Sequence, residues 1–141
     1  MTSAPGCWAK HGELSARHLS DPDGAHYRQL CGDAYAIQHP GQPGPQAIQS
    51  VGAHLVSLFA QLELGLSQSR ASAIMERGIR LKGHFTWLIP PSFDGAHTIV
   101  FMLANLHDPP FAAREWATSA WKAWAPHHAQ VRTWYDDLVR P

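Results

Sequence analysis

Apolar residues recur along much of this chain at the spacing of helices that bury one side. The clearest stripe lies within 47–64 and consists of Val51, Leu55, Leu58 and Leu62. Gly65 follows this stripe and predicts the end of the helix. Weaker stripes of the same kind predict further helices at 7–19, 25–39, 67–81, 111–124 and 126–139.

One stretch departs from this pattern. Residues 84–97 are apolar and partly β-branched, but Pro90 and Pro91 exclude a helix through their middle. We therefore expect an extended segment that lies across a helical body. Residues 98–106 fit either a short helix capped by Thr98 or a strand that pairs with 84–89, and we favour the helix.

Together these elements predict an all-α fold, a single-domain bundle of five to seven helices with an extended, Pro-interrupted segment near 84–97. The 141 residues suit one domain with one core. The domain is expected to span 1–141, with residues 1–6 as a flexible N-terminus.

The charge balance excludes two classes of partner. Lys plus Arg number 11 and Asp plus Glu number 11, so the formal net charge is zero. A nucleic-acid surface or a polybasic membrane patch needs an excess of basic residues. The N-terminus lacks the regions of a signal peptide, and no apolar run approaches the ~20 residues of a membrane span. We therefore expect a cytoplasmic protein without nucleic-acid or membrane partners.

Ten histidines are the most unusual feature of the composition. Residues four or seven positions apart lie on the same side of a helix. By this spacing, His18 belongs to the inward stripe of the first helix, and His26 and Asp33 belong to that of the second. His54 lies beside the apolar face of the third helix. His39 ends the second helix, where unwinding would let its side chain turn inward.

These five side chains predict a metal site inside the bundle. Helical bundles hold metal ions with one or two ligands from each of several facing helices. Imidazole groups with a carboxylate suit a divalent first-row metal such as zinc or iron, and an open position on the metal would activate water. In such an enzyme Tyr35 would be the catalytic side chain, donating a hydrogen bond to a small-molecule substrate. No H-x-x-x-H or H-E-x-x-H motif occurs, so the spacing alone is not diagnostic.

Two other interpretations stay open. The histidines could be core side chains bonded to carbonyl groups, with the Trp-rich C-terminal half forming the interface of an interaction module, such as a homodimer. A haem protein with His54 or His127 as axial ligand is a further alternative. The cluster of Trp116, Trp121 and Trp124 is better explained as core than as a ligand cage.

One segment resembles a known family. Residues 33–41 read DAYAIQHPG, and residues 49–55 read QSVGAHL. These resemble a family of small bacterial proteins of unknown function that have D-x-Y-x-x-Q-H-P, followed by a helix with H-L. The resemblance implies that the motif positions are Asp33, Tyr35, Gln38, His39 and His54. Members often begin with paired cysteines resembling a zinc knuckle, which this chain lacks, and have Glu where it has His18. The resemblance implies no particular reaction.

Overall fold

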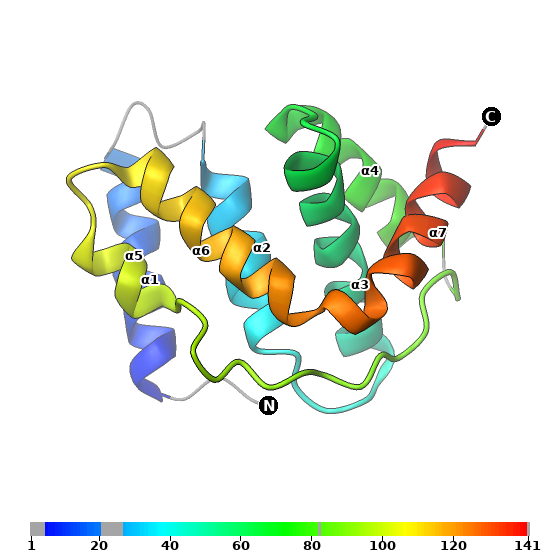
Figure 1. The fold of residues 1–141 in the computed structure, drawn as a ribbon, viewed down its shortest axis with the longest axis horizontal. Coiled ribbons are helices and arrows are strands. Elements are labelled where there is room, and N and C mark those ends of the chain that lie inside the picture. Colours follow the sequence, from blue (N-terminus) through cyan, green and yellow to red (C-terminus); the bar gives the residue numbers. More distant parts are fainter. Residues whose placement is uncertain (1–4, 21–26, 82, 141) are drawn as a thin grey trace.

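The structure is a computed structural model that describes residues 5–20, 27–81 and 83–140. Within these ranges it contains seven α-helices and no strand, which confirms the predicted all-α bundle (Figure 1). The helices are α1 (Pro5–Ser20), α2 (Arg28–Gln38), α3 (Pro45–Leu58), α4 (Gln68–Arg80), α5 (Ile99–Ala104), α6 (Pro109–Ala123) and α7 (His128–Val139). A π-helical turn, Phe59–Glu63, continues α3, and a 3-10 turn, Ala125–His127, precedes α7.

Local capping explains where several helices begin. Thr98 accepts a hydrogen bond from the N–H of Val100 at 3.2 Å, so residues after it form α5 and the helical alternative for 98–106 is confirmed. The two prolines at the start of α6 suit a first turn, whose N–H groups have no partner within the helix. α1 begins at Pro5, so positions 5 and 6 of the segment expected to be a flexible N-terminus lie in its first turn. Residues 1–4 lie outside the described residues.

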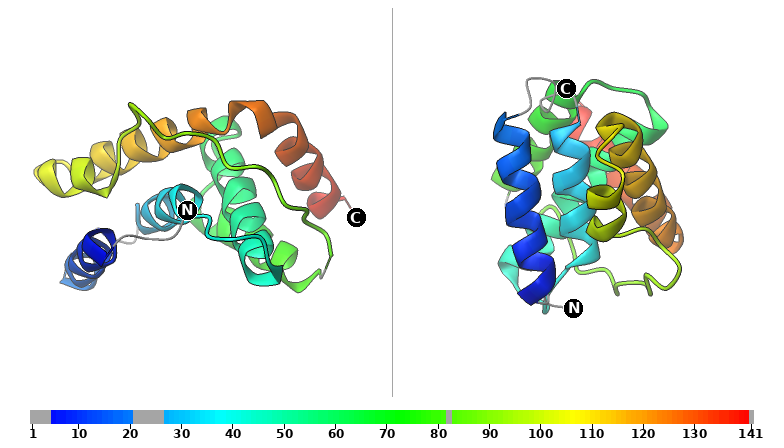
Figure 2. Two further views of the ribbon diagram at one scale, coloured as in Figure 1. Left: turned by 90° about the horizontal axis from the view of Figure 1, so that it is seen from below. Right: turned by 90° about the vertical axis from the view of Figure 1, so that its left-hand side faces the viewer.

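α2 and α3 form the centre of the bundle (Figure 1). α2 packs against both α3 and α6, and α3 packs in turn against α4 and α7. α1 lies at one end of the molecule, where it contacts mainly α5 (Figure 2). This arrangement gives α2 two buried sides, one toward α3 and another toward α6.

The tryptophans of α6 fill the core beside α2. Trp116 and Trp124 are fully buried, and Trp121 is nearly so. Each indole N–H has an acceptor, as buried indoles require. For example, Trp124 donates to the carbonyl of Ile37 at 3.2 Å, and Trp121 donates to Glu63 Oε1 at 2.8 Å. These contacts confirm that the tryptophan cluster belongs to the core.

Residues 83–98 cross the bundle without forming a helix, as predicted for 84–97; in Figure 1 they run along the lower edge. Phe85 is buried where two glycines leave room for its ring. A Cβ atom added to Gly78 would lie 2.6 Å from the ring, and one added to Gly52 would lie closer still. Both glycines therefore serve a close approach between helix and segment, and Trp134 packs edge-on against Phe85 at 5.1 Å between ring centroids.

Candidate functional site

Asp33 is a fully buried carboxylate on the side of α2 that faces α3. Its Oδ1 accepts hydrogen bonds from His54 Nδ1 and from Gln29 Nε2, each at 2.7 Å. Its Oδ2 accepts from Ser57 Oγ at 2.6 Å and from Gln61 Nε2 at 2.9 Å. A carboxylate offers about four lone-pair sites. These contacts therefore saturate Asp33, and we call the five side chains the Asp33 network.

The partners of Asp33 suit its carboxylate. Nε2 of Gln29 and Nε2 of Gln61 donate to it, and Ser57 Oγ and His54 Nδ1 can each offer a hydrogen as well. Hydrogen bonds of this kind replace the lost hydration of a buried charge. Burial, and secondarily the charge of Asp33, raises the pKa of Cys31 to about 12. Cys31 is therefore a protonated thiol and a poor nucleophile.

The Asp33 network comes from two polar stripes. Gln29 lies one helical turn before Asp33 on α2. His54, Ser57 and Gln61 are spaced three and four residues apart along α3 and the π turn, so they lie on one side. Sequence reasoning identified Asp33 and His54 but missed the other members. The available signal was a polar stripe at helical spacing within an otherwise apolar helix.

His54 is where the Asp33 network reaches solvent. Its side chain is 23% exposed and lines a cavity of about 440 Å³ between α2, α3 and α4. Because Nδ1 faces Asp33, Nε2 lies on the other edge of the ring, toward the cavity. This nitrogen has no hydrogen-bond partner among the described residues. The other lining residues are Arg28, Gln29, Gly32, Gln68, Ser69, Ser72 and Met75.

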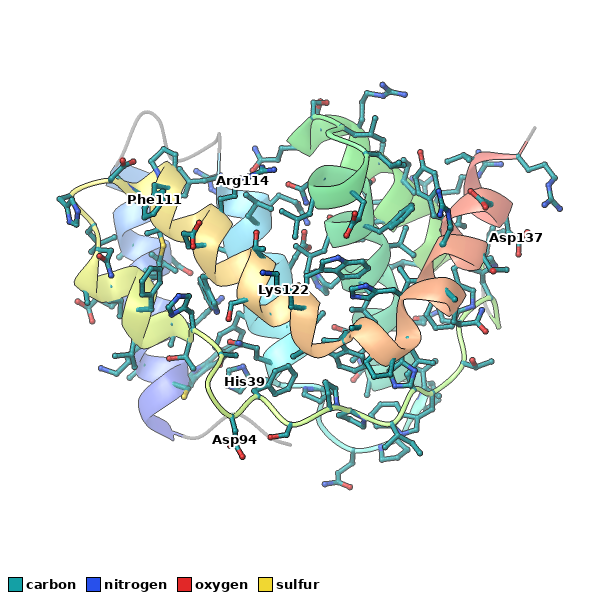
Figure 3. The ribbon with its side chains drawn as sticks, in the orientation of Figure 1. His39, Asp94, Phe111, Arg114, Lys122 and Asp137 are labelled. Atoms are coloured by element: carbon teal, nitrogen blue, oxygen red, sulfur yellow. The ribbon has the colours of Figure 1, made fainter. Side chains whose placement is uncertain are left out.

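The predicted metal ligands are only partly brought together. Asp33 and His54 are in contact. His39 lies at the end of α2 (Figure 3), where its Nδ1 bonds to a carbonyl of that helix at 2.8 Å. His26 and the side chain of His18 lie outside the described residues. In the part of the chain that is described, no group of three or more His, Cys, Asp or Glu side chains could hold a metal ion.

Tyr35 lies on a different side of α2 from Asp33. The two are separated by two positions in the sequence, and such positions differ by about 200° around a helix. Its ring packs between His11 and His39, with centroid distances of 4.4 and 4.2 Å. Tyr35 does not line the cavity beside His54. Tyr35 therefore lies apart from the cavity beside His54, and its catalytic role stays a prediction.

Gln38, another position of the resemblance, holds parts of the core together. Its Oε1 accepts from Trp116 Nε1 at 2.9 Å, and its Nε2 donates to the carbonyl of His97 at 2.7 Å. The side chain is almost completely buried. These contacts link α2, α6 and the end of the extended segment, so Gln38 stabilises the fold.

The profile of one family matches residues 1–125, a range that includes the Asp33 network and every residue lining the cavity. The chain belongs to the DUF5946 family, whose function is unknown. This membership confirms the resemblance to an uncharacterised family, while the motif itself stays a prediction.

No curated protein and no solved structure is significantly similar to the chain. Among the helices in the described ranges, none has the length and apolar character needed to cross a bilayer.

Proposed function

We propose that this member of DUF5946 binds a small molecule in the cavity beside His54 and that the Asp33–His54 pair transfers a proton to or from it. One observation supports this proposal above all. The saturated carboxylate of Asp33 holds one nitrogen of His54 at 2.7 Å, while the other nitrogen faces a cavity of about 440 Å³. Ligand cavities in proteins commonly measure roughly 300–1,000 Å³.

The geometry suits general acid–base chemistry. Asp33 accepts the Nδ1 hydrogen of His54, which fixes the tautomer in which neutral Nε2 is a proton acceptor. When Nε2 takes a proton from a ligand O–H group, the charge of Asp33 stabilises the resulting imidazolium. Gln29, Ser57 and Gln61 already hold the carboxylate in place, so this stabilisation requires no rearrangement. The protonated imidazole can return the proton to a product.

Metal binding is a second candidate, favoured by the same carboxylate–imidazole contact. Histidines that bind metals usually donate their other N–H to a carboxylate or a carbonyl. In this arrangement His54 would be the ligand, and Asp33, with its lone pairs in use, would orient it. The further ligands predicted from the sequence are His39 and either His18 or His26. The predicted metals are zinc and iron.

Elemental analysis separates the two candidates. The protein is purified without chelators as wild type and as His54→Gln. About one zinc or iron ion per chain, lost in the variant, supports the metal site. Wild-type protein without bound metal favours proton transfer by the Asp33–His54 pair alone.

A fragment screen tests ligand binding at His54. Wild type, His54→Gln and the exposed-histidine control His107→Gln are screened by thermal shift, and hits are followed through the imidazole NMR signals. We expect hits that shift the His54 signals and lose about tenfold or more in affinity in His54→Gln but not in His107→Gln. Hits that bind all three proteins equally would contradict the proposal.

A further inference from the structure

We infer that the ligand of the His54 cavity carries an oxyanion, a carboxylate or a phosphate group, that is bound by Arg28, Gln68 and Ser72. This inference rests on the proposed function, because it concerns the same cavity. Its support is the set of charges and hydrogen-bonding atoms that the described residues place around the cavity.

The charges of the lining favour an anion. Arg28 is the one lining residue with a permanent charge, and no aspartate or glutamate lines the described cavity. The buried carboxylate of Asp33 lies behind His54 and is already saturated. A guanidinium offers five N–H donors in a planar fork that matches carboxylate and phosphate oxygens. Arg28 can therefore bind an anion while keeping other contacts.

The lining also offers two donor side chains besides Arg28, those of Gln68 and Ser72. Oε1 of Gln68 accepts the backbone N–H of Gln29 at 2.7 Å, which identifies Nε2 as the other end of the amide. This Nε2 and the hydroxyl of Ser72 have no hydrogen-bond partner among the described residues. The N–H of Gln29 in the first turn of α2 is occupied by this bond and is not available to a ligand. Donors next to a guanidinium match the lone pairs of an oxyanion.

His54 then defines the other end of the ligand. Its Nε2 is the proton acceptor of the cavity when the imidazole is neutral. A ligand with an oxyanion toward Arg28 and an O–H group toward His54 would satisfy both ends. This describes a small hydroxy acid or a phosphate ester with a free hydroxyl. Met75 supplies an apolar side chain to the same cavity.

The test uses the full chain and simple probes, titrated at constant ionic strength. Sodium phosphate and sodium acetate are the oxyanion probes, and acetamide is the neutral counterpart of acetate. Heteronuclear NMR follows the side-chain amide of Gln68 and the backbone signal of Ser72. We expect saturable shifts with at least one oxyanion and none with acetamide. Saturation by phosphate alone indicates a phosphate ester, and saturation by acetate alone indicates a carboxylic acid.

Two arginine variants show whether the cation of the cavity is responsible. Arg28→Gln should weaken oxyanion binding by about tenfold, the effect of losing a charge-assisted hydrogen bond. Arg140→Gln is the matched control, because Arg140 is exposed at the end of α7, 3.3 Å from Asp137, which Figure 3 labels. The affinity of Arg140→Gln for the oxyanion probes should equal that of wild type.

Absence of saturable shifts with both oxyanions, or equal affinity in Arg28→Gln and wild type, overturns the inference. The proposed function is tested by separate outcomes. If neutral fragments still bind wild type and not His54→Gln, the cavity is a ligand site of different chemistry. If oxyanions bind in an Arg28-dependent way while no fragment depends on His54, the anion site stands and the proton-transfer role is lost.

Discussion

Two buried polar networks lie on different sides of α2 and end in different ways. The Asp33 network faces α3 and ends at His54, whose outer nitrogen faces a cavity. The Gln38 network faces α6 and ends at the fully buried indole of Trp116 and at the carbonyl of half-buried His97. Hydrogen bonding is required of any buried polar group, so it does not distinguish function from stability. A network is better evidence of function when it ends at a cavity in an atom that has no hydrogen-bond partner among the described residues, as the Asp33 network does.

The largest expected effect is that of Asp33→Ala. The substitution removes the acceptor of four hydrogen bonds at a fully buried position. We expect the free energy of unfolding to fall by about 3–5 kcal/mol, as when one partner of a buried ion pair is lost. Urea unfolding measures this change. A loss below about 1 kcal/mol would mean that the Asp33 network does not hold α2 against α3.

Gln38→Ala should cost somewhat less and should affect stability alone. It leaves the N–H of Trp116 and the carbonyl of His97 without their partner. At about 1–3 kcal/mol for each unsatisfied group, we expect a loss of about 2–4 kcal/mol. Ligand affinity at the cavity should stay at its wild-type value. His54→Gln should show the reverse, a smaller loss of stability with a large loss of affinity.

Urea unfolding and ligand titration of both variants, carried out below the unfolding transition, provide the comparison. If Gln38→Ala weakens ligand binding as much as His54→Gln does, the two networks are coupled through α2. The distinction between a closed and an open network would then be wrong for this protein.

Sequence patterns predicted the fold because hydrophobic spacing and prolines act locally. The stripe around Leu55 predicted α3, and Pro90 with Pro91 predicted the extended segment. The π turn had no such signal, since it depends on hydrogen bonds such as that from the N–H of Leu64 to the carbonyl of Phe59. The π turn carries Gln61, whose contact with Asp33 is seen only in the folded structure.

The candidate site was predictable only in part. The inward direction of Asp33 followed from its stripe, and its full burial confirms that direction. Its pairing with His54 depends on how α2 and α3 are aligned, which no local pattern determines. The role of Gln29, Ser57 and Gln61 was not predicted, because amides and hydroxyls are not typical metal ligands. Those neutral groups are what saturates the carboxylate.

The smallest effect concerns a third contact of α2 that connects it with α1. The ring of Tyr35 stacks on His39 and lies tilted against His11. Burial, and secondarily the nearby His39, lowers the pKa of His11 from its ordinary value of 6.5. The unfolded chain therefore binds this proton more tightly than the folded protein. It follows that stability falls as the pH drops below 6.5 and levels off below the folded pKa.

His11→Gln should remove this part of the pH dependence and leave the rest. Unfolding is measured by urea at about pH 5 and about pH 8, with the exposed-histidine variant His107→Gln as control. We expect a shallower loss of stability toward acid in His11→Gln alone, small because His11 is only partly buried and solvent screens its charge. Equal slopes in both variants would contradict the assignment. A shallower slope in His11→Gln alone would make this ring cluster a contact whose strength depends on the protonation of His11.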